Sequence, residues 1–227
     1  MLEIICSFIF RIFDGLLFSF LEKLQTASGT DRIPPLFLWF VAGAELAFCY
    51  LCCYLHTFFH ETGHYFVCKL LGITPRVVQI CVKEYRFRRL GETRFLFGLT
   101  PIPSGFVGDP ERPRLLQPTP AKQIAVSLGG IGTTAVLSAL TLAVAARSGG
   151  LLKWHIGLFG AFGVACVVAN SAGDNTDGER ILFAVRHQGR GFWPEELPKT
   201  TRQKYLFAVS QAGAILAFFL TLFLFAR

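Results

Sequence analysis

Four long apolar stretches recur along the chain, and each is close to the roughly twenty residues that a helix needs to cross the hydrocarbon core of a bilayer. Glu45 and His56 are the polar interruptions of the first stretch, and the second has no charged residue. The pattern therefore predicts four transmembrane helices within one domain. The four predicted spans are Leu36 to Phe59, Ile124 to Ala146, Trp154 to Gly173, and Tyr205 to Ala226.

The N-terminal segment, residues 1–35, has a different pattern. Its helical part is rich in Phe, Leu and Ile, but polar residues recur at spacings near three and four and form a narrow stripe. The stripe consists of Glu3, Ser7, Arg11, Asp14 and Glu22. We expect an amphipathic helix in the membrane interface, followed by a loop that ends at Pro34 and Pro35. A fifth spanning helix, with Arg11 paired to Asp14, is the alternative.

A short β pattern separates the first two spans. Residues Arg76 to Arg89 alternate in part between apolar and polar side chains, and Gly91 separates them from Thr93 to Thr100. This pattern predicts a β-hairpin, whereas the Pro-rich stretch from Pro101 to Pro120 is expected to be irregular. The predicted fold class is an all-α polytopic membrane protein, with an N-terminal amphipathic helix and a small β-hairpin.

Composition supports a membrane protein. Hydrophobic residues make up 52% of the 227 and charged residues only 16%, whereas a soluble domain carries about a quarter of charged residues. This excludes a disordered chain or a coiled coil. The formal charge of +7 does not indicate nucleic acid, because basic residues between long uncharged runs more often set membrane orientation. We therefore expect the lipid bilayer, and no nucleic acid, as a partner.

The distribution of Lys and Arg predicts the orientation. Nine lie from Arg76 to Lys122 and six from Arg180 to Lys204, while the other connections carry three or fewer. By the positive-inside rule both basic loops are cytoplasmic. The seven cysteines are odd in number and lie mostly in apolar runs, so we expect free, buried thiols and no disulfide framework.

The sequence His60-Glu61-Thr62-Gly63-His64 continues the first apolar helix without a break. Histidines four residues apart share one face of a helix, so both imidazoles can bind one zinc ion. The intervening Glu61 can take a proton from a zinc-bound water, whose pKa falls to about 7. A satisfied pair of histidines at a helix end is the alternative, but ionisable residues within a bilayer are costly unless they form a site. The motif thus predicts hydrolysis with Zn²⁺ as the cofactor.

A catalytic zinc site needs a third protein ligand besides the two histidines. The third span runs back toward the cytoplasmic side and ends in the polar run Asn170 to Arg180. Asp174 and Asp177 both lie in this run and can reach the depth of His60 and His64. The residues alone leave the two aspartates open.

With these motifs the chain resembles the site-2 proteases, intramembrane zinc metalloproteases that cut transmembrane or membrane-proximal segments. The resemblance rests on HETGH and on NSAGDNTDGERIL, which is similar to that family's Asn-x-x-Pro…Asp-Gly motif, with Gly173 in place of the proline. It implies zinc ligands His60, His64 and Asp177, Glu61 as general base, and Asn170 as a holder of the substrate backbone. Residues 36–227 would then form the intramembrane metalloprotease domain.

Two further segments resemble this family. TPIPSGFV, which includes Gly105, is similar to a segment that follows a membrane-associated β-hairpin, and SLGGIG is similar to the start of the next helix. Within the hairpin, Val82 and Tyr85 are candidates to bind an extended substrate along a strand edge.

The function we expect is cleavage of a membrane protein or membrane-bound peptide, in regulated intramembrane proteolysis or peptide maturation. We expect a multi-pass protein of a bacterial cell membrane, with the active site toward the cytoplasm. A catalytically inactive homologue that binds membrane proteins is one alternative, although Glu61 is intact. A membrane metal-handling protein is another, but it would need polar residues along all four spans.

Overall fold

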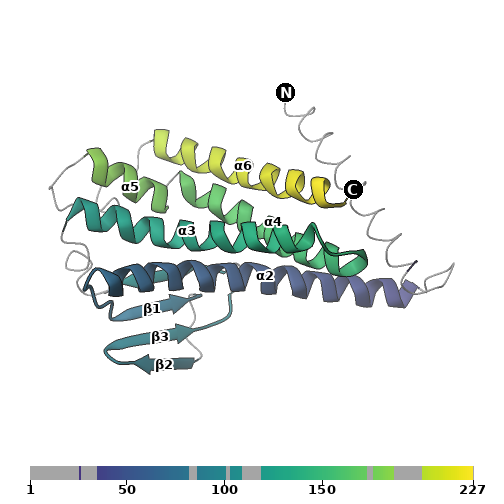
Figure 1. The fold of residues 1–227 in the computed structure, drawn as a ribbon, viewed down its shortest axis with the longest axis horizontal. Helices are drawn as coiled ribbons and strands as arrows, with labels where there is room; N and C mark the ends of the chain where they lie inside the picture. Colours follow the sequence, from purple (N-terminus) through teal and green to yellow (C-terminus); the bar gives the residue numbers. More distant parts are fainter. Residues whose placement is uncertain are drawn as a thin grey trace.

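The computed structural model describes residues 26, 35–81, 86–100, 103–108, 119–172, 176–186 and 201–226. Within these residues the fold is mostly helical, with one small sheet. The helices are α2 (Pro35–Leu70), α3 (Pro120–Ala145), α4 (Gly150–Ser171), α5 (Asp177–Arg186) and α6 (Thr201–Ala226). In Figure 1 the long helices lie side by side in the order α6, α4, α3, α2, and the sheet lies along the outer side of α2.

Four of the described helices are long and apolar enough to cross a membrane, as predicted. These candidate spans are Trp39–Leu70, Pro120–Ala145, Gly150–Ser171 and Lys204–Leu224. Helix α2 continues unbroken through the HETGH sequence to Leu70, which confirms that the motif extends the first span. The predicted N-terminal amphipathic helix lies outside the described residues, which include only Thr26 and Pro35 from residues 1–35.

The sheet has four strands in the order β2-β3-β1-β4, which are β1 (Val77–Ile80), β2 (Arg86–Leu90), β3 (Thr93–Phe97) and β4 (Gly105–Gly108). Strands β2 and β3 form the predicted hairpin, and its turn starts at Gly91 with a φ of +62°. The first arm of the predicted hairpin is shorter than the pattern from Arg76 to Arg89 indicated, because that segment contributes to both β1 and β2. The apolar β1 takes the buried centre of the sheet, whereas the arginine-rich β2 takes an edge.

A second correction concerns the Pro-rich stretch, which was expected to be irregular. Its residues Gly105–Gly108 form β4, which pairs antiparallel with β1 and makes the other edge of the sheet. The four residues of the strand contain no proline, so every one of them keeps the backbone N–H that a ladder requires.

The sheet packs against α2 over much of the length of that helix. Tyr65 and Val78 belong to one buried cluster, against which Tyr54, Phe58 and Phe97 also pack. Farther along α2, the Tyr50 hydroxyl donates a hydrogen bond of 2.9 Å to the carbonyl of Thr100. At about 1.5 Å per helical residue, these contacts cover roughly 20 Å of a membrane-spanning helix. The sheet is therefore associated with the membrane segment of the fold.

Candidate metal centre

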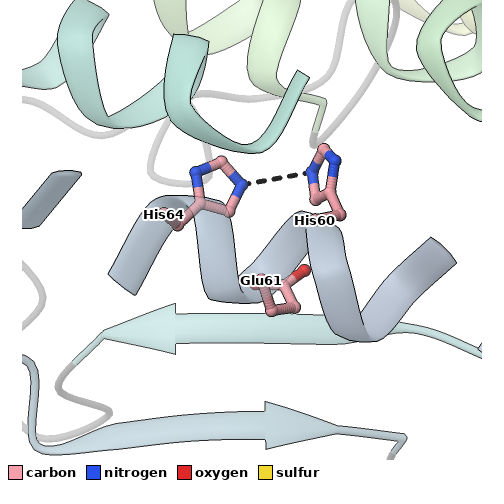
Figure 2. A group of neighbouring side chains, drawn as sticks. All are labelled: His60, Glu61 and His64. Atoms are coloured by element: carbon pink, nitrogen blue, oxygen red, sulfur yellow. Dashed lines mark hydrogen bonds between the residues drawn. The ribbon is translucent and has the colours of Figure 1, made fainter. Parts of the chain in front are cut away.

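Helix α2 brings two imidazoles together on one face. His60 and His64 are separated by one helical turn, and their Nε2 atoms lie 3.1 Å apart. Figure 2 shows both rings on the side of α2 that faces the other helices, while Glu61 points toward the strands. Both histidines are at least nine-tenths buried. The spacing of the motif therefore forms the expected convergent pair.

Asp177 completes a triangle with the two histidines. Its Oδ2 lies 2.9 Å from Nε2 of His60 and 3.2 Å from Nε2 of His64, and the residue is only 4% exposed. The start of α5 fixes this position, because Thr176 caps the helix by accepting a hydrogen bond from the N–H of Glu179. A Cβ at Gly178 would collide with the carbonyl of Ser171 at the end of α4, so the Asp-Gly pair permits the close turn.

The outer nitrogens of both rings are already engaged. Nδ1 of His64 donates to the carbonyl of Val126 over 2.7 Å. Nδ1 of His60 lies 3.2 Å from Oγ1 of Thr134, whose hydroxyl donates in turn to the carbonyl of Gly130. A carbonyl can only accept, and the Thr134 proton is already in use, so both Nδ1 atoms carry the ring protons. In the neutral form, both rings therefore present Nε2 lone pairs to the centre.

With neutral rings, three electron-pair donors thus face one another: the two Nε2 atoms and Oδ2 of Asp177. Oδ2 of Asp177 is buried and has no hydrogen-bond partner among the described residues, although both Nε2 atoms lie within 3.2 Å of it. A carboxylate beside two bare imidazole nitrogens is stable only with a cation at the centre.

The donor set fits zinc. Ligand atoms about 2.0 Å from a tetrahedral zinc lie about 3.3 Å from one another, and the observed separations are 2.9, 3.1 and 3.2 Å. Two nitrogens and one carboxylate oxygen are typical of catalytic zinc sites, which leave a fourth position open. The ligand atoms of His60, Glu61 and His64 also lie within 4.8 Å of one another, so Glu61 is close to the same centre.

Glycines make room for this centre. A Cβ at Gly130 of α3 would collide with Nε2 of His64 and lie 2.8 Å from Nε2 of His60. Likewise, a Cβ at Gly63 would collide with the carbonyl of Gly129, so α2 and α3 are in backbone contact beside the site. The sequence indicated Gly130 only as part of the SLGGIG segment, and it did not indicate a role for Val126 or Thr134. For the glycines, the available signal in the sequence was the spacing of small residues, which lets two helices approach closely.

A polar cavity of about 70 Å³ adjoins the histidines, which is room for about two water molecules. Glu61 faces it, and a Cβ at Gly105 of β4 would collide with the Glu61 carboxylate. Gly105 therefore lies directly beside Glu61 in the fold, and its predicted role in binding substrate stays a prediction. The cavity is lined by His60, Glu61, His64, Gly105, Phe106, Val107, Val126, Ser127, Asp177 and Arg180.

The other residues predicted to act in the site have different outcomes. Asn170 lies in the last turn of α4, where its amide donates to the carbonyl of Cys166 over 2.9 Å, and it is not part of the described cavity lining. Its predicted role in holding substrate remains a prediction. Val82, Tyr85 and Asp174 lie outside the described residues.

Comparison with known protein families identifies a match. The family model described as peptidase family M50 matches residues 48–226, more than three quarters of the chain, and this range includes the histidines, Glu61 and Asp177. No curated protein matches the chain.

Proposed function

Since the chain belongs to peptidase family M50, the site-2 protease family, we propose that it is an intramembrane zinc metalloprotease. It would hydrolyse peptide bonds in or near the transmembrane segments of membrane proteins or membrane-bound peptides. The observation that carries this proposal is the triangle of His60 Nε2, His64 Nε2 and Asp177 Oδ2, three buried atoms of zinc-binding type that lie 2.9 to 3.2 Å from one another.

Each residue of the centre has a distinct role. His60, His64 and Asp177 would hold the metal, and the hydrogen bonds at both Nδ1 atoms fix the ring orientation. Zinc bound there supplies Lewis acidity, which lowers the pKa of water to about 7 and polarises a carbonyl. The Glu61 carboxylate accepts the proton of the attacking water and can pass it to the leaving amine nitrogen.

The substrate would be bound as a strand along β4. A transmembrane helix keeps its amides hydrogen-bonded internally, so it must unwind before a carbonyl reaches the site. Strand β4 is a sheet edge, and Gly105, Phe106 and Val107 line the cavity beside Glu61.

Antiparallel pairing determines which groups of β4 are available. Cys81 donates its N–H to the carbonyl of Ser104. Hydrogen-bonded pairs alternate along an antiparallel ladder, so the Gln79–Phe106 pair is hydrogen-bonded as well. Gly105 and Val107 belong to the intervening pairs, and their backbone groups point away from β1. An extended peptide can pair with these groups. The hairpin edge at β2, which we had considered for this role, lies at the opposite side of the sheet.

The site would face the cytoplasm of a bacterial cell. It lies near the C-terminal end of α2, where Lys69 occupies the last turn and Lys122 donates from its Nζ to the carbonyl of Leu71. Arg76, Arg94 and further arginines belong to the same basic loop, which the positive-inside rule assigns to the cytoplasm. The active site would thus open on the side where substrate segments emerge from the membrane.

The decisive experiment compares wild type with Glu61→Gln. A suitable probe is an artificial single-span peptide that carries a Gly-Ser stretch in its membrane segment and a fluorophore and quencher at its ends. We expect wild type in detergent to hold one zinc per chain and to cleave the probe. The amide of Glu61→Gln cannot accept the water's proton, so cleavage should fall by about 10²- to 10⁴-fold while zinc content is unchanged.

The alternatives predict other results. An inactive binding homologue would hold the probe without cleaving it in either form. A metal-handling protein would move zinc across vesicles, and cleavage would be absent. Substantial residual cleavage by Glu61→Gln would remove this residue from the mechanism.

A further inference from the structure

One residue that lines the cavity has a buried hydroxyl without a hydrogen-bond partner in the part of the chain that the structure describes. Ser127 lies near the start of α3, directly after Val126, whose carbonyl holds His64. The residue is 1% exposed, and its Oγ has no hydrogen-bond partner among the described residues. Ser127 nevertheless lines the cavity that contains Glu61.

Ser127 differs in this respect from the other buried hydroxyls of α3. Thr134 donates to the carbonyl of Gly130, and Ser138 donates to the carbonyl of Thr134 over 2.7 Å. Bonding to the preceding turn is the usual arrangement for a serine or threonine within a helix. A buried hydroxyl without a partner is destabilising, so native proteins rarely retain one. The partner of Ser127 is therefore expected to enter the cavity from outside the chain.

The chemistry of the cavity lining specifies that partner. In the proposed mechanism the carboxylates of Glu61 and Asp177 act as acceptors, and Nδ1 of both His60 and His64 is engaged within the protein. Arg180 faces the other Asp177 oxygen, with Nη1 at 3.9 Å from Oδ1. Among the described lining side chains, Ser127 is thus the neutral donor available to a group with growing negative charge.

We propose that Ser127 is a catalytic residue whose hydroxyl donates a hydrogen bond to the oxygen of the scissile carbonyl. This rests on the proposed proteolysis. Water adds its oxygen to the carbonyl carbon, the C–N bond breaks, and Glu61 carries the water's proton to the leaving nitrogen. The electron pair of the C=O bond moves onto the oxygen and returns when the amine leaves. Ser127 keeps its proton throughout and forms no covalent bond.

The test pairs Ser127→Ala with Ser138→Ala. Both remove a buried hydroxyl from α3, but Ser138 is bonded within its own helix and is not part of the described cavity lining. Loss of an oxyanion donor lowers kcat by 10²-fold or more. We therefore expect Ser127→Ala to cleave the single-span probe with a kcat about 10²-fold lower and a KM near wild type. Ser138→Ala should have a kcat near that of wild type, and both variants should keep one zinc per chain.

Two further readouts separate catalysis from structure. A phosphinic peptide, whose anionic oxygen mimics the tetrahedral state, should bind Ser127→Ala about 10²-fold more weakly than wild type. The same variant should melt at or above the wild-type temperature, because alanine removes an unpaired buried hydroxyl.

The outcomes are distinguishable. Equal kcat values and equal phosphinate affinities for the two serine variants, with wild type active, would overturn this inference and leave the protease function intact. Loss of zinc or a lower melting temperature in Ser127→Ala would also overturn it, because the hydroxyl would then be structural. A wild-type protein that holds zinc but does not cleave would overturn the proposed function and this inference with it.

Discussion

Gly130→Ala should destroy the metal centre without disrupting α3. The added Cβ would collide with Nε2 of His64 and lie 2.8 Å from Nε2 of His60, about 0.6 Å inside the 3.4 Å at which ordinary contacts begin. Neither ring can move away freely, because each Nδ1 is bonded to α3 itself, through Val126 and Thr134. Both nitrogens must therefore leave the positions in which they converge with Asp177.

The expected magnitude follows from metal–ligand geometry. Ligand distances in a functional site vary by only about 0.2 Å, so a displacement of about 0.6 Å is roughly three times the tolerance. Mutation of a residue that merely supports a ligand already costs 10- to 100-fold in metal affinity. Displacing two ligands at once should therefore weaken zinc binding by at least about 100-fold.

Gly132→Ala is the matched control. Gly132 lies on the same helix, and a Cβ there would have no neighbour within 4 Å. Both changes gain similar helix propensity, up to about 1 kcal/mol, so the difference between them reports the steric effect. Zinc would be measured by mass spectrometry after equilibration in buffers of defined free zinc. Equal affinity of the two variants would refute the argument that Gly130 provides the space for the imidazoles.

Two other changes test the third ligand and the substrate edge. Asp177→Ala should lower zinc occupancy far more than Asp174→Ala, because Asp177 supplies an oxygen beside both imidazoles; metal loss from only the Asp174 variant would contradict this assignment. Val107→Pro removes an outward backbone donor of β4, so cleavage of the single-span probe should fall about 10-fold or more while zinc stays near one per chain. Loss of zinc from the proline variant would show instead that β4 supports the metal site.

The sheet marks where sequence patterns were insufficient. Alternation from Arg76 to Arg89 correctly indicated β structure, but it did not show that the segment divides into two strands on either side of β3. Strand order depends on which edges meet when distant segments pack, and β1 pairs with both β3 and β4. The four residues of β4 are too few to give a periodic signal among prolines.

The third ligand shows the same limit at the site. From the residues alone, Asp174 and Asp177 were equal candidates, and only resemblance to a family favoured Asp177. The structure brings Asp177 to the histidines through the cap at Thr176 and the close turn at Gly178. The cap lies within the start of α5, and the turn brings this start against the end of α4. The spacing of residues in the run does not show which aspartate these contacts direct toward the histidines.

The sequence by itself determined the parts that depend on neighbouring residues. Four apolar lengths match a bilayer, and a spacing of four residues puts His60 and His64 on one helix face, because both follow from the fixed rise and turn of a helix. Only tertiary structure decided that Gly130 makes room for their rings, that Val126 and Thr134 orient them, and that Ser127 lines the cavity. Those properties arise where α2 and α3 approach within backbone contact, at positions more than sixty residues apart in the chain.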